Sequence, residues 1–565
     1  MKTTITGAEV VLRVLESQGV DCIFGYPGGT MLPLYDRLYQ SKITHHLVRH
    51  EQGAVHMADA YARATGKVGI VFVTSGPGAT NTVTGLVNAK LDSAPVLVIT
   101  AQVPSALIGT DGFQEADVVG ITIAATKHND LIRDVENLEK AVLDALYIAK
   151  EGRPGPVLLD IPKDVLNCEV DYPKYQIKPL EFKKEIVKGD FDDAARALCE
   201  AVRPVCYFGG GVINADASEE LREIVSLLNL PSTGTLMGLG AISGNDPRFI
   251  GMPGMHGTYT ANMAIHNSDL LFSVGVRFDD RVTGKTSVFA PGAKIIHIDI
   301  DESEISKIKK ADWGLIGDAK PVIKKLTSKV KQYLKEKHPG RDKTINSWWK
   351  SINKWQKDQP LRFSKSTKTI KPQELISEVY QQTKGDLIVA TDVGQHQMWV
   401  AQYFPITYPR ELMTSGGLGT MGFGLPAAIG AQVGRPDKQV VAFVGDGSFQ
   451  MNIQEMAMLI DDNVPVKVII LNNSSLGMVR QWQDMFYEQR FMATDISVAP
   501  DFVKVAKAYG VESLRIDDPS QLKSGIKTML DHKGAFLLDA IVDKDEHVYP
   551  MVPAGKASKD MLLQK

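Results

Sequence analysis

Cysteine is scarce in this chain of 565 residues, which contains only Cys22, Cys168, Cys199 and Cys206 and no C-x-x-C pair. That spacing suits neither a disulfide framework nor a zinc site, and it is typical of a reducing compartment. No apolar run approaches the roughly 18 residues that a membrane-spanning helix needs. The first twenty residues are too polar for a secretion signal and predict an amphipathic helix. We therefore expect a cytoplasmic protein.

A strong excess of one charge is also missing. The 63 Lys and Arg residues nearly balance the 66 Asp and Glu residues, and the formal net charge is −3. This balance favours neither a polyanion nor a membrane surface as a partner. The stretch 324–371 is rich in lysine and contains Trp348, Trp349 and Trp355, a combination that can bind nucleic acid. The acidic balance of the whole chain favours a helix and linker with a solvated basic face instead, and no nucleic-acid partner.

One local pattern recurs along the chain: a short β-branched apolar run, a polar or glycine-rich turn, and then a helical pattern. Examples of these runs lie at 68–78, 95–102, 156–162, 205–211, 270–278, 294–301, 386–394, 439–447 and 465–473. Apolar strands that alternate with helices predict an α/β fold with doubly wound parallel sheets covered on both faces. In such sheets, ligands bind beyond the carboxyl ends of the strands.

Two changes in composition divide this series. Residues 168–185 are polar and contain prolines, which predicts a linker, and the basic stretch described above forms the second boundary. A chain of this length is too long for one hydrophobic core. We expect three α/β domains at about 1–180, 190–345 and 370–545, followed by a tail at 546–565.

The most informative segment is VGDGSFQMNIQEMAMLIDDNVPVKVIILNN, residues 444–473. Asp446 follows one apolar strand and Asn473 follows the next, so both should reach the same edge of one sheet. The Asp446 carboxylate, the Asn473 amide oxygen and a backbone carbonyl at Ser475 are suitable ligands for Mg²⁺, whose coordination phosphate oxygens usually complete. A GDG turn alone is common at strand ends. GDG followed by an apolar strand that ends in NN resembles the signature of thiamine-diphosphate enzymes.

That family also needs a distant glutamate, and residues 47–66 supply Glu51 at the end of a short apolar strand. Small and apolar neighbours would favour the neutral carboxyl, which could then share a proton with a ring nitrogen. The resemblance implies that this nitrogen is N1′ of the cofactor's aminopyrimidine. Alternatively, Glu51 only caps the following helix. The presence of the GDG…NN segment favours the catalytic interpretation.

A glycine-dense segment, SGGLGTMGFGLPAAIG at 415–430, precedes a predicted helix and would let the backbone approach a ring closely. The resemblance implies that Met421 lies under the bent cofactor and that the Gly419 carbonyl meets its 4′-amino group. It also implies further cofactor contacts from Gly445, Asp446, Gly447, Ser448, Asn473 and Met478. The alternative is an ordinary turn with Met421 in the core.

Nearly the whole chain resembles the acetohydroxyacid synthase (acetolactate synthase) catalytic subunits. The matching segments are FGYPGGTMLPLYD (24–36), RHEQGA (49–54), TSGPGATN (74–81), GFQE (112–115), KHN (127–129), GRPGPVLLDIPKDV (152–165), GMHGT (254–258), RFDDRVTGK (277–285) and GMVRQWQ (477–483). The resemblance implies decarboxylation of pyruvate and condensation with pyruvate or 2-ketobutyrate. The products would be 2-acetolactate or 2-aceto-2-hydroxybutyrate, in the first common step of branched-chain amino acid biosynthesis. The three domains would be pyrimidine-binding, FAD-binding and diphosphate-binding, with the tail over the active site.

The resemblance also assigns substrate-side residues. Three lie beside the cofactor: Phe113, Gln114 and Lys163. Trp482 and Arg281 would select the acceptor, Trp482 as a wall against its alkyl group and Arg281 as a fork for its carboxylate. Considered without the family, Trp482 could be a core residue and Arg281 a surface partner of Asp279 or Asp280. The family's herbicide channel would be lined by Trp482, Met255, Pro104 and Lys163.

The segment that begins with RFDDRVTGK is similar to a P-loop, but Asp279 lies where a P-loop requires glycine, and its negative charge would repel phosphate. The resemblance implies FAD contacts instead. These are Arg153, Gly209, Gly210, Gly211, Thr235, Leu236, Met237, Met255, His256, Arg277, Asp299 and Asp318. No G-x-G-x-x-G fingerprint occurs, and the flavin would be structural.

The resemblance further implies a homodimer or tetramer, with Glu51 and the GDG…NN loop contributed by different subunits, and a separate small regulatory subunit. A pyruvate oxidase, in which FAD accepts electrons, is an alternative enzyme. A non-catalytic homologue is the alternative outside the enzymes. Such a protein should lack Glu51, Asp446 or Asn473, and all three are present.

Overall fold

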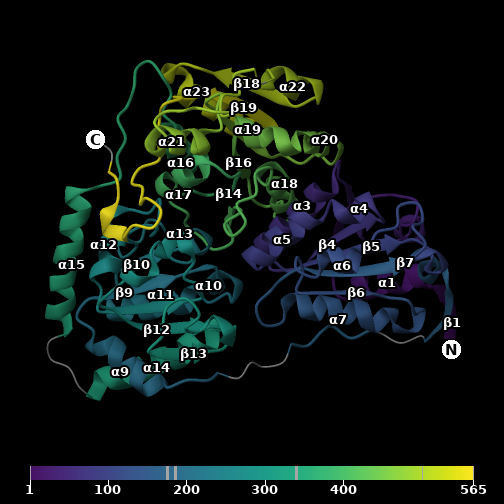
Figure 1. The fold of residues 1–565 in the computed structure, drawn as a ribbon, viewed down its shortest axis with the longest axis horizontal. Coiled ribbons are helices and arrows are strands. Elements are labelled where there is room, and N and C mark those ends of the chain that lie inside the picture. Colours follow the sequence, from purple (N-terminus) through teal and green to yellow (C-terminus); the bar gives the residue numbers. More distant parts are fainter. Residues whose placement is uncertain (1, 174–176, 183–186, 337–340, 499, 564–565) are drawn as a thin grey trace.

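The computed structural model describes residues 2–173, 177–182, 187–336, 341–498 and 500–563. Three parallel sheets follow one another along the chain, each with helices on both faces (Figure 1). The predicted fold class is therefore confirmed. Among the described residues, no helix combines the length and the apolarity needed to cross a bilayer.

The N-terminal sheet has the strand order β3-β2-β4-β5-β7-β6. Its strands are β2 (Cys22–Tyr26), β3 (Thr44–Leu47), β4 (Gly69–Thr74), β5 (Val96–Gln102), β6 (His128–Leu131) and β7 (Val157–Pro162). Its helices are α1 (Gly7–Ser17), α2 (Leu32–Leu38), α3 (Glu51–Thr65), α4 (Pro77–Thr80), α5 (Val83–Asp92), α6 (Val118–Thr122), α7 (Leu138–Lys150) and α8 (Lys163–Asn167). Every residue of β4, β5 and β7 is buried, which explains their continuous apolar sequences.

The middle sheet has five strands in the order β10-β9-β11-β12-β13. These are β9 (Pro204–Phe208), β10 (Ser232–Gly234), β11 (Leu270–Val274), β12 (Lys294–Asp299) and β13 (Trp313–Ile316). The helices of this region are α9 (Phe191–Glu200), α10 (Gly210–Asn214), α11 (Ser218–Leu228), α12 (Tyr259–Asn267), α13 (Asp280–Thr283), α14 (Ala319–Glu336) and α15 (Arg341–Asp358).

The C-terminal sheet repeats the topology of the first, in the order β15-β14-β16-β17-β19-β18. Its strands are β14 (Ile388–Thr391), β15 (Leu412–Met413), β16 (Val440–Gly445), β17 (Lys467–Asn472), β18 (Glu512–Ile516) and β19 (Phe536–Ile541). Its helices are α16 (Pro372–Thr383), α17 (Gln395–Tyr403), α18 (Gly424–Gly434), α19 (Asp446–Phe449), α20 (Met456–Asp461), α21 (Gly477–Phe486), α22 (Phe502–Ala508) and α23 (Leu522–Asp531).

The chain start and the first linker differ from the prediction. Residues 2–6 form a strand, β1 (Lys2–Thr6), and the predicted helix begins only at Gly7, behind a capping box between Thr6 and Glu9. The partner of β1 is β8 (Glu169–Pro173), an antiparallel strand inside the segment predicted as a linker. The pairing joins residues far apart in sequence, so no local pattern reveals it. Positions 174–176 and 183–186 of that linker lie outside the described residues.

The tryptophans of the basic stretch belong to the packing of the middle domain. Trp348 of α15 is buried and its indole N–H donates to the carbonyl of Pro204 at 3.1 Å. Trp349 donates to the carbonyl of Asn229 at 2.9 Å. These hydrogen bonds direct both indole N–H groups into the protein. The helix that was predicted here is present as α14 and α15.

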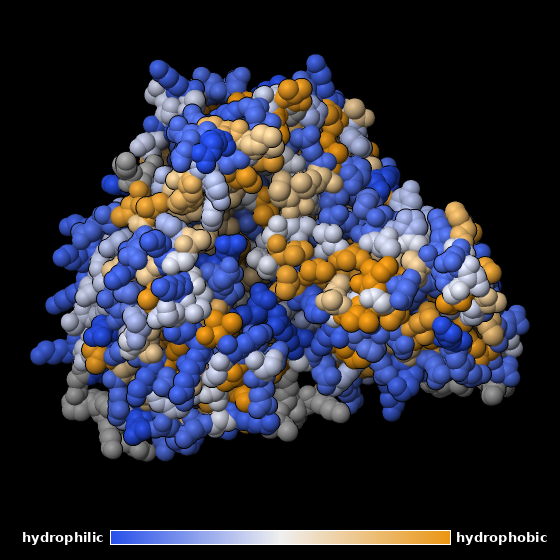
Figure 2. All heavy atoms as spheres, viewed as in Figure 1, coloured by the Kyte–Doolittle hydropathy of each residue, from blue (hydrophilic) through white to orange (hydrophobic). Residues whose placement is uncertain are grey.

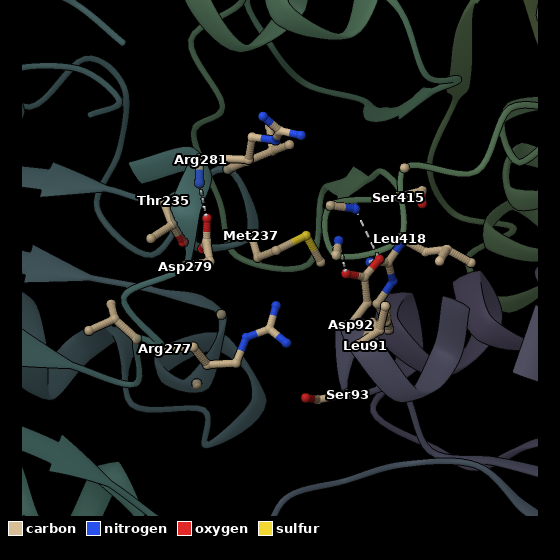
Figure 3. Close-up of a pocket in the computed structure, with 18 of the residues that line it drawn as sticks. Leu91, Asp92, Ser93, Thr235, Met237, Arg277, Asp279, Arg281, Ser415 and Leu418 are labelled. Atoms are coloured by element: carbon tan, nitrogen blue, oxygen red, sulfur yellow. Dashed lines mark hydrogen bonds and ion pairs between the residues drawn. The ribbon is translucent and has the colours of Figure 1, made fainter. Parts of the chain in front are cut away.

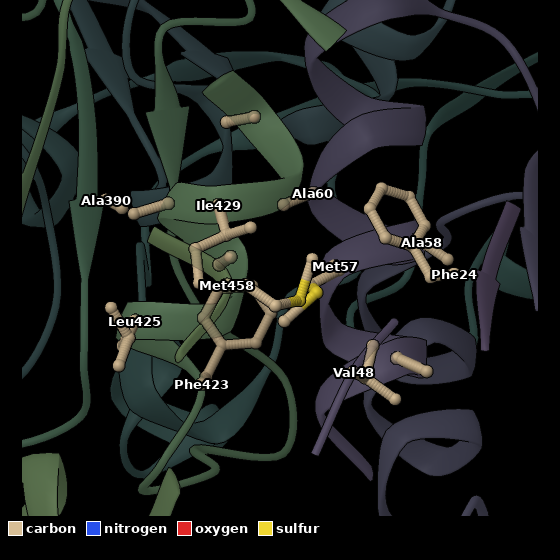
Figure 4. Close-up of a cluster of buried hydrophobic side chains, with 14 of the residues drawn as sticks. Phe24, Val48, Met57, Ala58, Ala60, Ala390, Phe423, Leu425, Ile429 and Met458 are labelled. Carbon is tan, nitrogen blue, oxygen red and sulfur yellow. The ribbon is translucent and has the colours of Figure 1, made fainter. Parts of the chain in front are cut away.

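The N- and C-terminal domains meet through α3 and α18. Small residues along both helices let the backbones approach so closely that a Cβ at Gly430 would lie 2.0 Å from the carbonyl oxygen of Met57. Met57, Phe423 and Ile429 fill the space around this contact with buried apolar side chains (Figure 4). The contact fixes the carboxyl edge of the first sheet relative to the third.

Candidate active site

A cavity of about 2200 Å³ lies where the three domains meet. Its walls come from the carboxyl ends of the C-terminal strands, from the middle domain, and from the end of α5 at Leu91, Asp92 and Ser93 (Figure 3). Pockets for one small ligand usually occupy about 300–1,000 Å³. The cavity therefore has room for more than one bound group.

The C-terminal sheet brings the GDG and NN segments to one end of the cavity. Asp446 follows β16 and Asn473 follows β17, and these strands are parallel neighbours. Asp446 is buried, its Oδ2 atom has no hydrogen-bond partner, and burial raises the pKa of its carboxyl to about 7. The amide oxygen of Asn473 accepts from the backbone N–H of Ser475 at 3.1 Å. A buried carboxylate oxygen without a partner, among amide and carbonyl oxygens, fits a hard cation such as Mg²⁺.

Two further residues of this edge were missed in the sequence. Gln395 and His396 begin α17, directly after the turn that follows β14, and both line the cavity. His396 packs against Gly445, its Nε2 atom has no partner, and burial lowers the pKa of its imidazole to about 3. A neutral imidazole with a free nitrogen can bind an oxyanion by hydrogen bonding. The strand-end rule would have found them, because β14 adjoins β16.

The glycine-dense loop before α18 forms one side of the cavity. Gly419 has a φ of 73°, in the left-handed region that favours glycine. The Cε atom of Met421 lies 3.9 Å from the position that a Cβ would take at Gly447, so Met421 faces the GDG turn. Gly419, Met421, Gly447, Ser448 and Met478 all line the cavity. The loop therefore lies opposite the candidate metal end.

Two buried carboxylates hold this loop, and neither was singled out in the sequence. Asp92 of the N-terminal domain accepts from the backbone N–H groups of Gly416 and Gly417 at 3.0 and 2.7 Å (Figure 3). Asp392 accepts from Gly422 and Gly424, both at 2.9 Å. The backbone N–H groups of this loop thus donate to one carboxylate from each of two domains, which restricts the movement of the loop.

The middle domain supplies the cavity wall that faces the end of α5 and the glycine-dense loop, and the guanidinium of Arg277 points from it into the cavity (Figure 3). Asp299, whose carboxyl has its pKa raised to about 6 by burial, also lines it. Of the residues expected to contact FAD, those at the surface of the cavity are Arg153, Gly210, Gly211, Thr235, Leu236, Met237, Met255, His256, Arg277, Asp299 and Asp318. Gly209 lies behind this wall, where a Cβ would be 2.4 Å from the carbonyl oxygen of Gly275.

Arg281 and Trp482 reach the same cavity from different domains. The Arg281 side chain is 67% exposed and its guanidinium is 3.9 Å from Asp280. Such an exposed pair contributes little and leaves the guanidinium able to bind a carboxylate. Trp482 is half-buried on α21, edge-to-face with Phe486 at a centroid distance of 5.4 Å. The surface-pair alternative for Arg281 thus has only a weak contact, and Trp482 is at a cavity wall instead of in the core.

Glu51 is not part of this cavity wall. It is the first residue of α3, where the sequence had suggested a strand end, and His50 is the N-cap. Glu51 is therefore not the N-cap itself, but its carboxylate lies in the first turn, where the amino end of the helix favours a negative charge, and the helix-capping alternative stays open. Its Oε2 atom accepts from the side-chain amide of Asn81 at 2.9 Å. The carboxyl group is only half-buried in the single chain.

Three other substrate-side candidates accompany Glu51 at the carboxyl edge of the N-terminal sheet. Gln114 has a φ of 59° and packs on Gly76, and Lys163 begins α8 directly after β7. Phe113 is 89% exposed. The cavity lining includes none of these residues. One chain therefore presents two separate groups of candidate residues, one in the cavity and one on the N-terminal domain.

The C-terminal tail packs against the cavity wall at Met255 and His256. The backbone N–H of Val552 donates to the carbonyl of Met255 at 2.8 Å. The side-chain amide of Gln402 bridges the carbonyls of His256 and Tyr549 at 2.8 and 3.2 Å. The tail thereby supports the wall that carries Met255.

Comparison with known proteins finds relatives that cover all three domains. Models of the thiamine pyrophosphate enzymes match the chain three times: the N-terminal TPP binding domain at residues 5–121, the central domain at 191–326 and the C-terminal TPP binding domain at 392–540. The acetolactate synthase large subunit of Haemophilus influenzae is 45% identical and aligns over 99% of this chain and 98% of its own length. The large subunits of acetolactate synthase isozymes 3 and 2 of Escherichia coli are 45% and 44% identical, over 99% of both chains.

Proposed function

The chain belongs to the acetolactate synthase large subunits of the thiamine pyrophosphate enzymes, and we propose that it decarboxylates pyruvate and transfers the two-carbon fragment to a second 2-keto acid. With pyruvate as acceptor the product is 2-acetolactate, and with 2-ketobutyrate it is 2-aceto-2-hydroxybutyrate. The observation that carries the proposal is the buried Asp446 carboxylate, whose Oδ2 atom has no hydrogen-bond partner, beside Asn473 in a cavity that also contains Arg281 and Trp482.

Thiamine diphosphate supplies, when bound, the nucleophilic carbon and the electron sink that decarboxylation of a 2-keto acid requires. Asp446, Asn473 and the backbone carbonyl of Ser475 would hold Mg²⁺, and His396 and Gln395 would contact the diphosphate. The orphaned Oδ2 of Asp446 and Nε2 of His396 support this assignment, because buried polar atoms rarely lack partners. Met421 and the carbonyl of Gly419 would orient the aminopyrimidine.

Glu51 would hold the proton at N1′ of the aminopyrimidine, and a second copy of the chain would bring it to the cavity. Its position outside the cavity of its own chain supports a homodimer as the smallest active unit. Phe113, with 89% of its surface exposed, also fits an interface, since burying such a side chain is worth roughly 1.5–3 kcal/mol. Figure 2 shows a hydrophobic area around α6, where Ile123 is 65% exposed.

Substrate selection would rest on both groups of residues. Arg281 would bind the carboxylate of the acceptor, and Trp482 would contact its alkyl group. From the second copy, Phe113 would provide apolar contact, Gln114 a hydrogen bond and Lys163 a positive charge along the approach. Lys163 follows β7 and Pro104 follows β5, and a hydrogen bond from Ser105 N to Asp164 Oδ1 at 2.9 Å joins their segments.

FAD is the second group that we expect in the cavity. The volume of about 2200 Å³ and the inward-pointing Arg277 support it, because both leave space for a large anionic ligand. Arg277 and Arg153 would neutralise its phosphates. The relatives are named as large subunits, and a separate small subunit with a regulatory role is accordingly a proposed partner.

Incubation of the purified protein with pyruvate, thiamine diphosphate, Mg²⁺ and FAD tests the function. We expect 2-acetolactate, and a second product when 2-ketobutyrate is added. Formation of acetate or hydrogen peroxide without acetolactate would identify a pyruvate oxidase and refute the proposal. Omission of Mg²⁺ in the presence of a chelator should abolish the reaction.

A further inference from the structure

Acidic side chains of the C-terminal domain hold the segment that leads to Glu51. Glu455 ends a 3-10 helix, Gln450–Glu455, that follows the GDG turn. Both of its carboxylate oxygens accept from the backbone N–H of Arg49, each at 3.1 Å. Next along the chain, Asp461 pairs with the Arg49 guanidinium, and Asp462 contacts the imidazole of His46 at 2.7 Å. The strand-to-helix connection before Glu51 is thus held from another domain.

Glu455 is the central member of this set because it is fully buried and touches α3 itself. A Cβ at Gly53 would lie 2.8 Å from its Oε1 atom, so the carboxylate rests directly on the first turn of α3. The amino end of a helix of 15 residues carries a partial positive charge that favours a carboxylate there. Asp461 and Asp462 are more exposed and screened by solvent.

A buried carboxylate is costly unless hydrogen bonds satisfy it, and burial raises the pKa of Glu455 to about 7. A glutamine would fill the same volume without the cost of burying an ionisable group. Both oxygens of Glu455 accept from one backbone amide, that of Arg49, two residues before the glutamate proposed for catalysis. This contact gives the acid a local function that packing alone does not.

We propose that Glu455 is a positioning residue that fixes the backbone at Arg49 and the first turn of α3, and thereby the direction in which Glu51 presents its carboxyl group. The inference rests on the proposed function, because it concerns the geometry of Glu51 in that reaction. Misplacement of a reacting group by about 1 Å can reduce a rate on the order of a hundredfold. A slight movement of the first turn of α3 would therefore lower kcat.

The test is Glu455→Gln in the full-length protein, with Glu411→Gln as the matched control. Glu411 is also buried, in the same domain, and its carboxylate pairs with Lys438 at 3.4 Å, a partner that does not belong to α3. Both changes remove one buried carboxylate of the C-terminal domain. For Glu455→Gln we expect kcat to fall at least about tenfold while the KM for pyruvate changes little. For Glu411→Gln we expect wild-type kcat.

Hydrogen–deuterium exchange of the protein without cofactor provides a readout that does not depend on turnover. The amides of residues 46–53 should exchange faster in Glu455→Gln than in the wild type, and should be unchanged in Glu411→Gln. A second variant, Gly53→Ala, keeps the glutamate but displaces it, because its Cβ would meet Oε1 at 2.8 Å. It should show the same fast exchange and the same loss of kcat.

Unchanged exchange at residues 46–53 in both test variants would overturn the inference, as would an equal loss of kcat in Glu411→Gln. Faster exchange with wild-type kcat would also overturn it, because the backbone would then move without effect on Glu51. These results are separable from failure of the proposed function, which would appear as a wild-type protein that forms no acetolactate.

Discussion

Replacement of Glu51 by glutamine separates the chemistry of this side chain from its structural role. Glutamine has the same shape, and its amide oxygen can still accept from Asn81, which donates to Glu51 at 2.9 Å. The other terminal atom lies near Gly78, where an ideal Cβ would be 3.5 Å away, so no clash arises. The half-buried position limits the cost of the exchange to less than about 1 kcal/mol of folding free energy.

The effect on turnover should be far larger. An amide cannot exchange a proton with a ring nitrogen, and a positioned acid or base contributes about 10²–10⁴-fold to a rate. This corresponds to about 3–5 kcal/mol in the activation barrier. We expect kcat for acetolactate formation to fall by that factor, while the KM for pyruvate and the midpoint of thermal unfolding stay close to those of the wild type.

Glu51→Asp is the matched control, because it keeps the acid and withdraws it by one methylene group. It should retain more activity than Glu51→Gln if proton exchange is the function of the side chain. A folded Glu51→Gln protein with turnover within about tenfold of the wild type would refute the catalytic assignment. So would a loss of activity that parallels a loss of folded protein, since Glu51 would then be structural.

Three other substitutions test the acceptor contact of Trp482, the contact between α3 and α18, and the buried carboxyl group of Asp160. Trp482→Leu should reduce the preference for 2-ketobutyrate over pyruvate by about tenfold, measured as the ratio of the two products in a mixed assay; an unchanged ratio would exclude the assigned contact. Gly430→Ala gains at most about 1 kcal/mol of helix propensity, but its Cβ would lie 2.0 Å from the Met57 carbonyl oxygen. Gly434 in the same helix is the control, because the nearest atom to a Cβ there is a side-chain methyl carbon at 2.7 Å. Denaturant unfolding should therefore show a net loss of about 2 kcal/mol for Gly430→Ala and a smaller loss for Gly434→Ala; equal losses would contradict the backbone contact. Burial raises the pKa of Asp160 from 3.8 to about 6. As pH rises between these values, Asp160 ionises in the unfolded chain before it does in the folded one, so the free energy of unfolding falls. Asp160→Asn should make this fall smaller, and an unaltered pH dependence would contradict the raised pKa.

Most of the strands named from the sequence lie inside their sheets, although the interior strands β2 and β19 were not among them. β4, β5, β16 and β17 lie inside their sheets and are buried on both faces, so their sequences are unbroken apolar runs. The edge strands have no such constraint. β6 is HNDL and β10 is STG, which are turn-like sequences that become strands only because a neighbour offers a partner. Pairing energy, and not local preference, forms these edges.

The site residues that could be predicted from the sequence are likewise those that follow central strands. Asp446 and Asn473 could be placed together from the sequence because each follows a recognisable central strand, and His396 could have been found in the same way. Asp92 and Glu455 could not. Each is a carboxylate in a helical pattern whose partners, the amides of Gly416 and Arg49, come from another domain. Only the packing of α3 against α18 brings these groups together.

The separation of Glu51 from the cavity leads to a complementation experiment. If each site combines Glu51 of one copy with Asp446 of another, then Glu51→Gln and Asp446→Asn chains are inactive alone but form one intact site when they associate. Random association of equal amounts should restore about a quarter of wild-type activity, since half of the dimers are mixed and one of their two sites is complete. A site within a single chain predicts no recovery, because every chain in the mixture carries a defect. Recovery should disappear if the two variants are purified separately and assayed together under conditions in which subunits do not exchange.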